Sequence, residues 1–187
     1  MKSIIRDEMK IKRKAMSREE VMVKSLIAQS TFLDSDIYRD SETLMLYIPI
    51  GNETSTLEII EKAHNDRKTV LVPVTDSKTY ELSAHRITRD SVFEKGTFSV
   101  TEPKEKAVFE ASKIDVVLVP GVAFSRDGNR IGFGKGCYDK FLKGTEAIKV
   151  GFCYDFQVTD EFYADSFDIE MDCLITEKEF IDCRSGY

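Results

Sequence analysis

Residues 114–142 read IDVVLVPGVAFSRDGNRIGFGKGCYDKFL, and this stretch says most about the fold. Its first part, 114–119, is a continuous apolar run, which is typical of a strand buried on both faces of a parallel sheet. A Pro-Gly pair and a glycine-rich loop follow, and residues 138–142 have the pattern of a helix start. A buried strand, a loop and a helix in this order indicate an α/β protein.

The glycine-rich loop is a candidate phosphate site. Glycines tolerate positive φ angles, so this backbone can turn its amide N–H groups inward around an anion. Arg130 and Lys135 add positive charge, a helix start favours bound phosphate, and Asp139 is placed to face a metal ion. The glycines are Gly128, Gly132, Gly134 and Gly136. The spacing matches neither the Walker A loop nor G-x-G-x-x-G, so the residues alone leave open a glycine-rich hairpin without a ligand.

Three further helices are predicted from apolar spacing and from capping residues. Residues 2–15 carry apolar side chains at helical spacing. Ser17-x-x-Glu20 and Ser55-x-x-Glu58 each have the capping-box pattern that begins a helix. The expected apolar positions are Ile5 and Met9 in the first helix, Val21, Leu26 and Ile27 in the second, and Leu57, Ile60 and Ala63 in the third.

Short β-rich runs alternate with these helices. The arrangement predicts an α/β fold: a three-layer sandwich with a mostly parallel central sheet and helices on both faces. Residues 80–87 alternate as an edge strand or a hairpin arm does. No repeat or linker divides the chain, so a single domain over 1–187 is expected. The other predicted strands are 43–48, 69–74, 147–153 and 172–176.

Composition narrows the class of protein. The 187 residues are 42% hydrophobic and 32% charged, which excludes a disordered chain. No apolar run approaches the roughly 20 residues that cross a bilayer, and the charged N-terminus lacks the apolar core of a secretion signal. The net charge of −6 disfavours non-specific binding of nucleic acid. The four cysteines form no C-x-x-C pair, so we expect reduced thiols, no zinc site and a cytoplasmic location.

The sequence around the loop resembles the signature of the 5-formyltetrahydrofolate cyclo-ligase family, also called methenyltetrahydrofolate synthetases. That signature has a strand ending in Pro-Gly, then G-x-R-[apolar]-G-x-G-x-G, a Tyr-Asp pair and an apolar helix. Two positions depart from it: Cys137 replaces an aromatic residue, and Phe167 replaces a polar one. Matches run in order along nearly the whole chain, at residues 2–6, 10–16, 48–56, 102–103, 115–124, 128–142, Gln157 and 168–177.

The resemblance implies a reaction. A member of this family converts 5-formyltetrahydrofolate to 5,10-methenyltetrahydrofolate, with ATP as co-substrate, Mg²⁺ as cofactor, and ADP and phosphate as products. The γ-phosphoryl group of ATP would pass to the formyl oxygen and give an imidate phosphate, which N10 then attacks. Arg130 and Lys135 would act as catalytic groups that neutralise the phosphoryl charge.

The resemblance also implies a set of binding residues. The ATP-binding residues would be Lys2, Ser3, Ile4, Ile5, Arg6, Arg130, Ile131, Gly132, Phe133, Gly134, Lys135, Gly136, Cys137 and Tyr138. Ile48, Glu53 and Tyr138 would contact the folate, and Asp139 and Asp168 would hold Mg²⁺. The expected partners are small molecules only, without nucleic acid or membrane, and the expected state is a monomer.

Other interpretations stay open. Without the resemblance, Glu53 is expected to be a solvated loop carboxylate, and the basic run 10–14 a solvated helix face. A non-catalytic nucleotide- or folate-binding protein on the same scaffold fits the departures at Cys137 and Phe167. A sugar-phosphate isomerase-like enzyme would use the glycine loop for phosphate without ATP.

Overall fold

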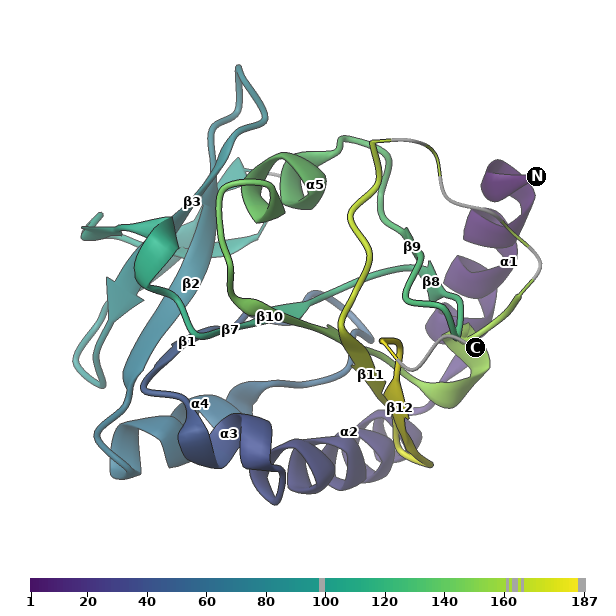
Figure 1. Ribbon diagram of the computed structural model, residues 1–187, viewed down its shortest axis with the longest axis horizontal. Coiled ribbons are helices and arrows are strands. Elements are labelled where there is room, and N and C mark those ends of the chain that lie inside the picture. Colours follow the sequence, from purple (N-terminus) through teal and green to yellow (C-terminus); the bar gives the residue numbers. More distant parts are fainter. Residues whose placement is uncertain (98–99, 161, 163–164, 166, 185–187) are drawn as a thin grey trace.

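An eight-stranded mixed sheet forms the centre of the protein (Figure 1). The computed structural model describes residues 1–187 except 98–99, 161, 163–164, 166 and 185–187. In sheet order the strands are β12 (Phe180–Asp182), β11 (Cys173–Ile175), β10 (Ile148–Phe152), β7 (Val116–Val119), β1 (Thr43–Met45), β2 (Thr69–Thr75), β3 (Leu82–Ile87) and β6 (Val108–Phe109). The pairs from β11 through to β2 are parallel, while β12, β3 and β6 pair antiparallel, so the prediction of a mostly parallel sheet is confirmed.

Alternate residues of the central strands enter two separate cores. In β1, Leu44 packs on one side and Met45 on the other, because successive side chains of a strand point to opposite faces. The first core receives α2 (Arg18–Leu33), α3 (Asp36–Asp40) and α4 (Leu57–Asn65), which lie together below the sheet in Figure 1. The second receives α5 (Cys137–Leu142) on the opposite face. The predicted helices on both faces are confirmed.

The first helix packs away from the main sheet. In α1 (Lys2–Ala15) the buried residues are Ile5 and Met9, as the spacing predicts. They contact Ile131 and its neighbours in a two-stranded ribbon of β8 (Ala123–Phe124) and β9 (Arg130–Ile131). This ribbon leads directly into the glycine loop, so the apolar face of α1 sets the position of that loop. A second ribbon pairs β4 (Phe93–Lys95) with β5 (Thr101–Pro103).

The capping box at Ser17 is confirmed, but the predicted apolar side of α2 is wrong. Ser17 Oγ accepts from the Glu20 N–H at 3.1 Å, and Glu20 Oε2 accepts from the Ser17 N–H at 2.8 Å. Leu26 and Ile27 are 47% and 46% exposed. The side that is buried instead consists of Ser25, Ala28, Gln29 and Phe32. These positions share the helical spacing, and the two polar ones are buried because they accept hydrogen bonds from the N–H groups of Ser55 and Glu58.

The predicted capping box at Ser55 is also wrong. The helix α4 begins after Thr56, whose side chain donates to the Tyr47 carbonyl rather than capping its own helix. The Glu58 N–H is instead satisfied by Gln29 Oε1 of α2 at 2.9 Å. A tertiary partner therefore replaces the local cap.

Residues 80–87 form the predicted hairpin arm only from Leu82 onward, and β6 rather than β3 is the edge of the sheet.

Candidate active site

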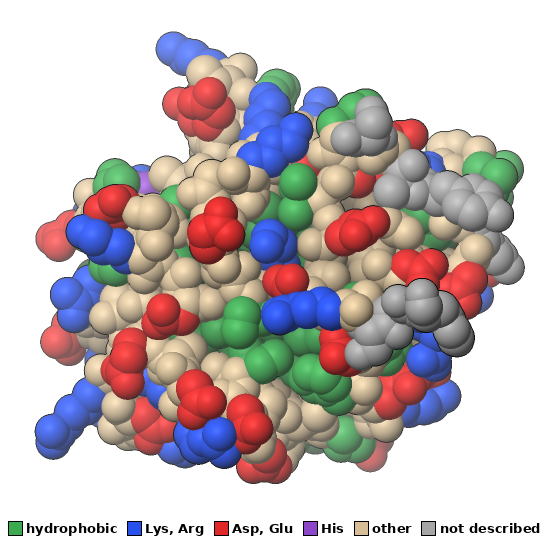
Figure 2. Space-filling model, viewed as in Figure 1, with side chains coloured by type: hydrophobic (Ala, Val, Ile, Leu, Met, Phe, Trp, Pro, Cys, Tyr) green, Lys and Arg blue, Asp and Glu red, His purple; other side chains and the backbone are tan. Residues whose placement is uncertain are grey.

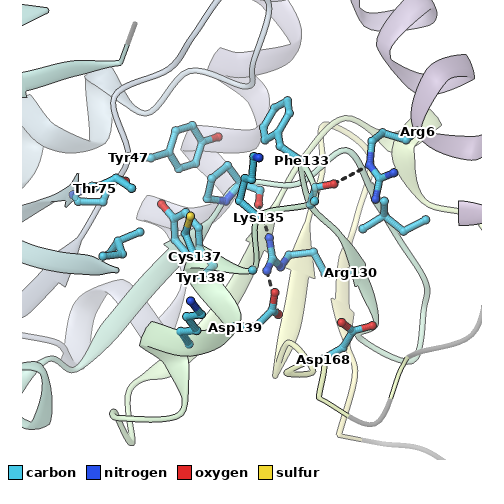
Figure 3. A pocket seen from close by; sticks show the side chains of 18 of the residues that line it. Arg6, Tyr47, Thr75, Arg130, Phe133, Lys135, Cys137, Tyr138, Asp139 and Asp168 are labelled. Carbon is cyan, nitrogen blue, oxygen red and sulfur yellow. Dashed lines mark hydrogen bonds and ion pairs between the residues drawn. The ribbon is translucent and has the colours of Figure 1, made fainter. Parts of the chain in front are cut away.

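A cavity of about 900 Å³ lies at the carboxyl ends of β1, β2 and β7 (Figure 3). Chain segments that follow these strands form its walls, and the glycine loop between β9 and α5 lines another side. Ligands of open α/β sheets bind in this position. The cavity brings together Lys2, Arg6, Ile48, Glu53, Arg130, Ile131, Gly132, Phe133, Gly134, Lys135, Gly136, Cys137, Tyr138, Asp139 and Asp168.

Three of the implied ATP-binding residues do not reach the cavity. Ser3 and Ile4 are exposed on other sides of α1, and Ile5 is buried against the β8–β9 ribbon. The reason is helical spacing: Lys2 and Arg6 are one turn apart and face the cavity, while the residues between them point elsewhere.

The glycine loop has the backbone that its composition predicts. Gly134 and Gly136 have φ angles of +96° and +66°, which residues with a Cβ rarely adopt. A Cβ at Gly132 would lie 2.8 Å from Nη1 of Arg130, so the loop and this guanidinium pack without a gap. Arg6 donates from Nε to the Gly132 carbonyl at 2.9 Å and fastens the loop to α1 (Figure 3).

Arg130 is a buried cation at the centre of the site, with its side chain 5% exposed. Its Nη2 lies 3.0 Å from Asp139 Oδ1, and its guanidinium stands over the Tyr138 ring, 5.6 Å from the centroid. Within the described part of the chain, Nε of Arg130 has no hydrogen-bond partner. A buried donor without a partner is costly, so this guanidinium is held at a site where its charge is only partly compensated.

The two predicted metal ligands are held by cations. Asp139 pairs with Arg130 as described, and Asp168 accepts a hydrogen bond from Lys2 Nζ at 2.7 Å. Burial raises the pKa of Asp168, but hydrogen bonds from Lys2 and the Asp165 N–H outweigh it and leave that pKa below its ordinary value. The Asp168 carboxylate is thus suited to remain ionised. Among the described residues no group of three or more His, Cys, Asp or Glu side chains is gathered for a metal.

Glu53 is buried, so the expectation of a solvated carboxylate is wrong. Its side chain is 6% exposed and accepts from the Ile50 N–H at 3.0 Å. Burial raises its pKa, and this effect outweighs the opposing influence of the Ile50 N–H and Arg13. Burial also raises the pKa of the neighbouring Tyr138, and the charge of Glu53 adds to that shift. Glu53 and Tyr138 thus form a weakly solvated part of the cavity wall.

Arg13 is a site residue that the sequence argument missed. The basic run 10–14 is not simply a solvated face, because the Arg13 side chain is only 13% exposed and its Nη1 lies 3.9 Å from Glu53 Oε1. Lys10 and Arg13 also stand over the Phe133 ring, 5.7 and 5.6 Å from its centroid. Arg13 lies seven residues after Arg6, which places both on one helical face, so the 3.6-residue period was a signal for it in the sequence.

Other lining residues were also missed. Tyr47, Thr75 and Leu82 belong to segments at the ends of β1, β2 and β3, and the only signal for them is their place beside a strand end. The two residues that depart from the family pattern, Cys137 and Phe167, both line the cavity. Phe167 is 61% exposed, so it adds apolar surface at the rim rather than packing into the core.

The fold and the cavity define an α/β protein that carries a glycine-rich loop beside a pocket at the carboxyl edge of its sheet. The sequence profile of the 5-formyltetrahydrofolate cyclo-ligase family matches residues 1–177. The chain therefore belongs to that family.

Individual relatives agree with this assignment. The 5-formyltetrahydrofolate cyclo-ligase of Mus musculus is 24% identical over 186 residues, covering 92% of each chain. The structure of 5,10-methenyltetrahydrofolate synthetase from Aquifex aeolicus is similar with a TM-score of 0.88 and 33% identity, covering 100% of this chain and 94% of the other. That of the Mycoplasma pneumoniae synthetase is similar with a TM-score of 0.77 and 27% identity, covering 95% and 99%.

Proposed function

We propose that this protein is an ATP-dependent 5-formyltetrahydrofolate cyclo-ligase, which makes 5,10-methenyltetrahydrofolate and releases ADP and phosphate. The observation that carries the proposal is one cavity with two chemically different ends. One end combines the glycine loop with Lys2, Arg6 and Arg130, which suits a triphosphate. The other combines a buried carboxyl group and an aromatic wall, which suits a pterin.

At the phosphate end, Arg130 and Lys135 would neutralise the charge of the transferring phosphoryl group. Arg130 is fixed by its contacts with Asp139 and Tyr138, so little reorganisation of its guanidinium is needed when a phosphate binds beside it. The N–H groups between Gly132 and Gly136 would supply further donors. Phosphoryl transfer depends mainly on such positioning and charge stabilisation.

Asp139 and Asp168 fit a Mg²⁺ ion in part. They offer oxygen ligands at the phosphate end of the cavity, and Mg²⁺ usually takes only one or two protein carboxylates and fills its other positions with water and phosphate oxygens. We propose that they hold the ion, which would offset negative charge on the triphosphate. The contacts of these carboxylates with Arg130 and Lys2 would then be shared with the ion.

At the other end, Glu53 would bind the N–H edge of the pterin, with Tyr138 and Ile48 against the ring. A carboxylate that accepts two N–H donors recovers solvation that burial removed, and burial is what raises the pKa of Glu53. Arg13, near Glu53, would keep the charge there balanced.

The reaction we propose has two steps. The formyl oxygen on N5 attacks the γ-phosphorus of ATP, the bond to the ADP oxygen breaks, and an imidate phosphate forms. N10 then attacks the activated carbon and loses its proton, and the C–O bond breaks to release phosphate. Activation is needed because the formyl oxygen is otherwise a poor leaving group. The protein's part is to hold the formyl group, the γ-phosphoryl group and N10 in position and to exclude water.

The test is a turnover assay with purified protein. Near-ultraviolet absorbance of the methenyl product should rise only when ATP, Mg²⁺ and 5-formyltetrahydrofolate are all present. Binding of ATP and folate without any rise would favour a non-catalytic binding protein. Turnover of a phosphosugar without nucleotide would favour the isomerase-like alternative.

We further propose that the protein acts as a monomer on small molecules, in the cytoplasm and as one domain. No helix in the described residues is long and apolar enough to cross a membrane. On the face that Figure 2 shows, acidic and basic side chains are interspersed rather than gathered into a basic stripe, which gives nucleic acid no extended contact there. Size-exclusion chromatography with light scattering would test the oligomeric state.

A further inference from the structure

We propose that Tyr80 is a positioning residue that holds the Lys135 ammonium at the rim of the cavity, ready for the phosphate. The proposal rests on the function proposed above, since it concerns the nucleotide site of that reaction. Lys135 Nζ lies over the Tyr80 ring, 5.0 Å from its centroid. A cation at this distance from the face of an aromatic ring is attracted by the ring quadrupole.

Lys135 needs an external constraint. It sits between Gly134 and Gly136, both with positive φ, and its side chain is exposed. Within the described part of the chain, no carboxylate forms an ion pair with it. A long flexible side chain on a glycine-rich loop samples many rotamers. A contact with phosphate must therefore overcome the entropy that is lost when one rotamer is fixed. The Tyr80 ring is the contact that limits these rotamers.

The backbone of Tyr80 holds the ring in place. Asp76 accepts from the N–H groups of Lys78 and Thr79, each at 2.8 Å, and its own carbonyl accepts from the Tyr80 N–H at 3.0 Å. The Asp76 N–H donates to Glu81 and closes the turn. Within it Tyr80 has a φ angle of +58°, a left-handed conformation that favours Gly or Asn over a bulky aromatic residue. Strain at a bulky residue points to a use for its side chain.

The turn that carries Tyr80 is positioned to bring the ring to Lys135. It joins β2 to β3, and the hairpin rises beside α5 in Figure 1. Thr75 and Leu82, on either side of the turn, line the cavity. The hairpin therefore brings the ring to the glycine loop from across the cavity, a contact that joins positions far apart in the sequence.

A neutral ring suits this task better than a carboxylate. Lys2 shows the alternative, because its ammonium is bound to both Asp165 and Asp168 at 2.7 Å. A phosphate would have to compete with those carboxylates for Lys2. The contact between Lys135 and Tyr80 restricts the ammonium but leaves its charge uncompensated, so a phosphate can attract it without displacing an anion.

The test compares two substitutions in two backgrounds. Tyr80→Asn removes the ring but suits the left-handed backbone, so it should not lower the melting temperature. It should weaken ATP binding, measured as both KM and calorimetric Kd, by roughly 2- to 5-fold, the size of an exposed cation–π contact. The value of kcat should change less. Tyr80→Phe keeps the ring and should restore the wild-type values. In a Lys135→Ala background, Tyr80→Asn should have no further effect.

Several results would overturn the inference. These are unchanged ATP affinity in Tyr80→Asn, an equal loss in Tyr80→Phe, or an undiminished effect of Tyr80→Asn in the Lys135→Ala background. The calorimetric arm separates this inference from the proposed function. A protein that binds ATP with the expected pattern but never closes the folate ring contradicts the proposed function and supports the role of Tyr80. A wild-type protein that binds no ATP contradicts both.

Discussion

The two faces of the sheet differ in what they bury. The face that α2, α3 and α4 cover buries apolar side chains such as Phe32, Tyr38 and Ile59, each 5% exposed or less. On the other face, α5 has six residues, and the glycine loop beside it leaves a cavity in which Arg130 and Glu53 are buried as charged or ionisable groups. Apolar burial stabilises the folded state, whereas burial of charge opposes it unless partners compensate. Both faces bury apolar cores, and the ionisable groups of the site are gathered beside the second core, at the carboxyl edge of the sheet.

Substitution in the apolar face should have the largest effect on stability. Phe32 is fully buried and makes an edge contact with Tyr38, at 5.7 Å between ring centroids. Phe32→Ala should lower the free energy of unfolding by about 3–5 kcal/mol, measured by urea denaturation. Activity per folded molecule should stay near that of the wild type. Phe180→Ala, at a side chain 44% exposed, is the matched control and should cost much less. Equal losses in both variants would contradict the comparison.

Substitution of Arg130 should have the largest effect on catalysis. Arg130→Ala removes a preorganised donor at the phosphate end and should lower kcat on the order of 10²-fold. Arg126→Ala is a suitable control, because Arg126 is exposed and pairs with Glu179 outside the cavity. If Arg130→Ala keeps the wild-type kcat and KM for ATP, the glycine loop and its arginine are structural only.

The two cavity carboxylates should act through one ion. Asp168→Asn and Asp139→Asn should each raise the Mg²⁺ concentration needed for half-maximal activity, and Asp168→Asn should change the melting temperature little. The double variant should lose less than the product of the single effects, since both side chains serve the same site. Asp165→Asn removes only the other partner of Lys2 and tests whether the effect comes from Lys2 instead. Equal behaviour of Asp165→Asn and Asp168→Asn would argue against a metal role.

Substitution of Glu53 should have the smallest effect on stability, and it should stabilise the protein rather than destabilise it. Because burial raises the pKa of Glu53 in the folded state, its contribution to stability is complete below the unfolded pKa and is lost as pH rises through the folded pKa. Glu53→Gln, which cannot ionise, should therefore unfold at a higher temperature than the wild type at pH 7. The difference should shrink toward about pH 4, where the carboxyl group is protonated in both states.

The same variant should lose function at one end of the cavity only. KM for 5-formyltetrahydrofolate should rise while KM for ATP stays the same, because the proposed partner of Glu53 is the pterin and not the nucleotide. Thermal unfolding at several pH values and initial-rate kinetics measure the two parts. Destabilisation at pH 7 would show that the contact of Glu53 with Arg13 outweighs its desolvation.

The sequence by itself determined the features that depend on short windows of chain. The apolar run 114–119 predicted a strand buried on both faces, and β7 is that strand. The capping box of Ser17 and Glu20 was predictable because both of its hydrogen bonds join residues only three positions apart. Gly134 and Gly136 predicted a left-handed backbone because only glycine adopts it without strain. The position of the cavity followed from the rule for strand ends in α/β sheets.

Tertiary structure decided which polar groups were buried and what they contacted. Gln29 is on the inner side of α2 because the N–H of Glu58, 29 residues later, needs an acceptor there. Arg13 turns from a surface cation into a site residue because the loop after β1 brings Glu53 within 3.9 Å. Lys135 meets Tyr80 only because the β2–β3 hairpin stands beside α5. Each partner lies outside any local window, so its contribution depends on the order of strands in the sheet rather than on periodicity or propensity.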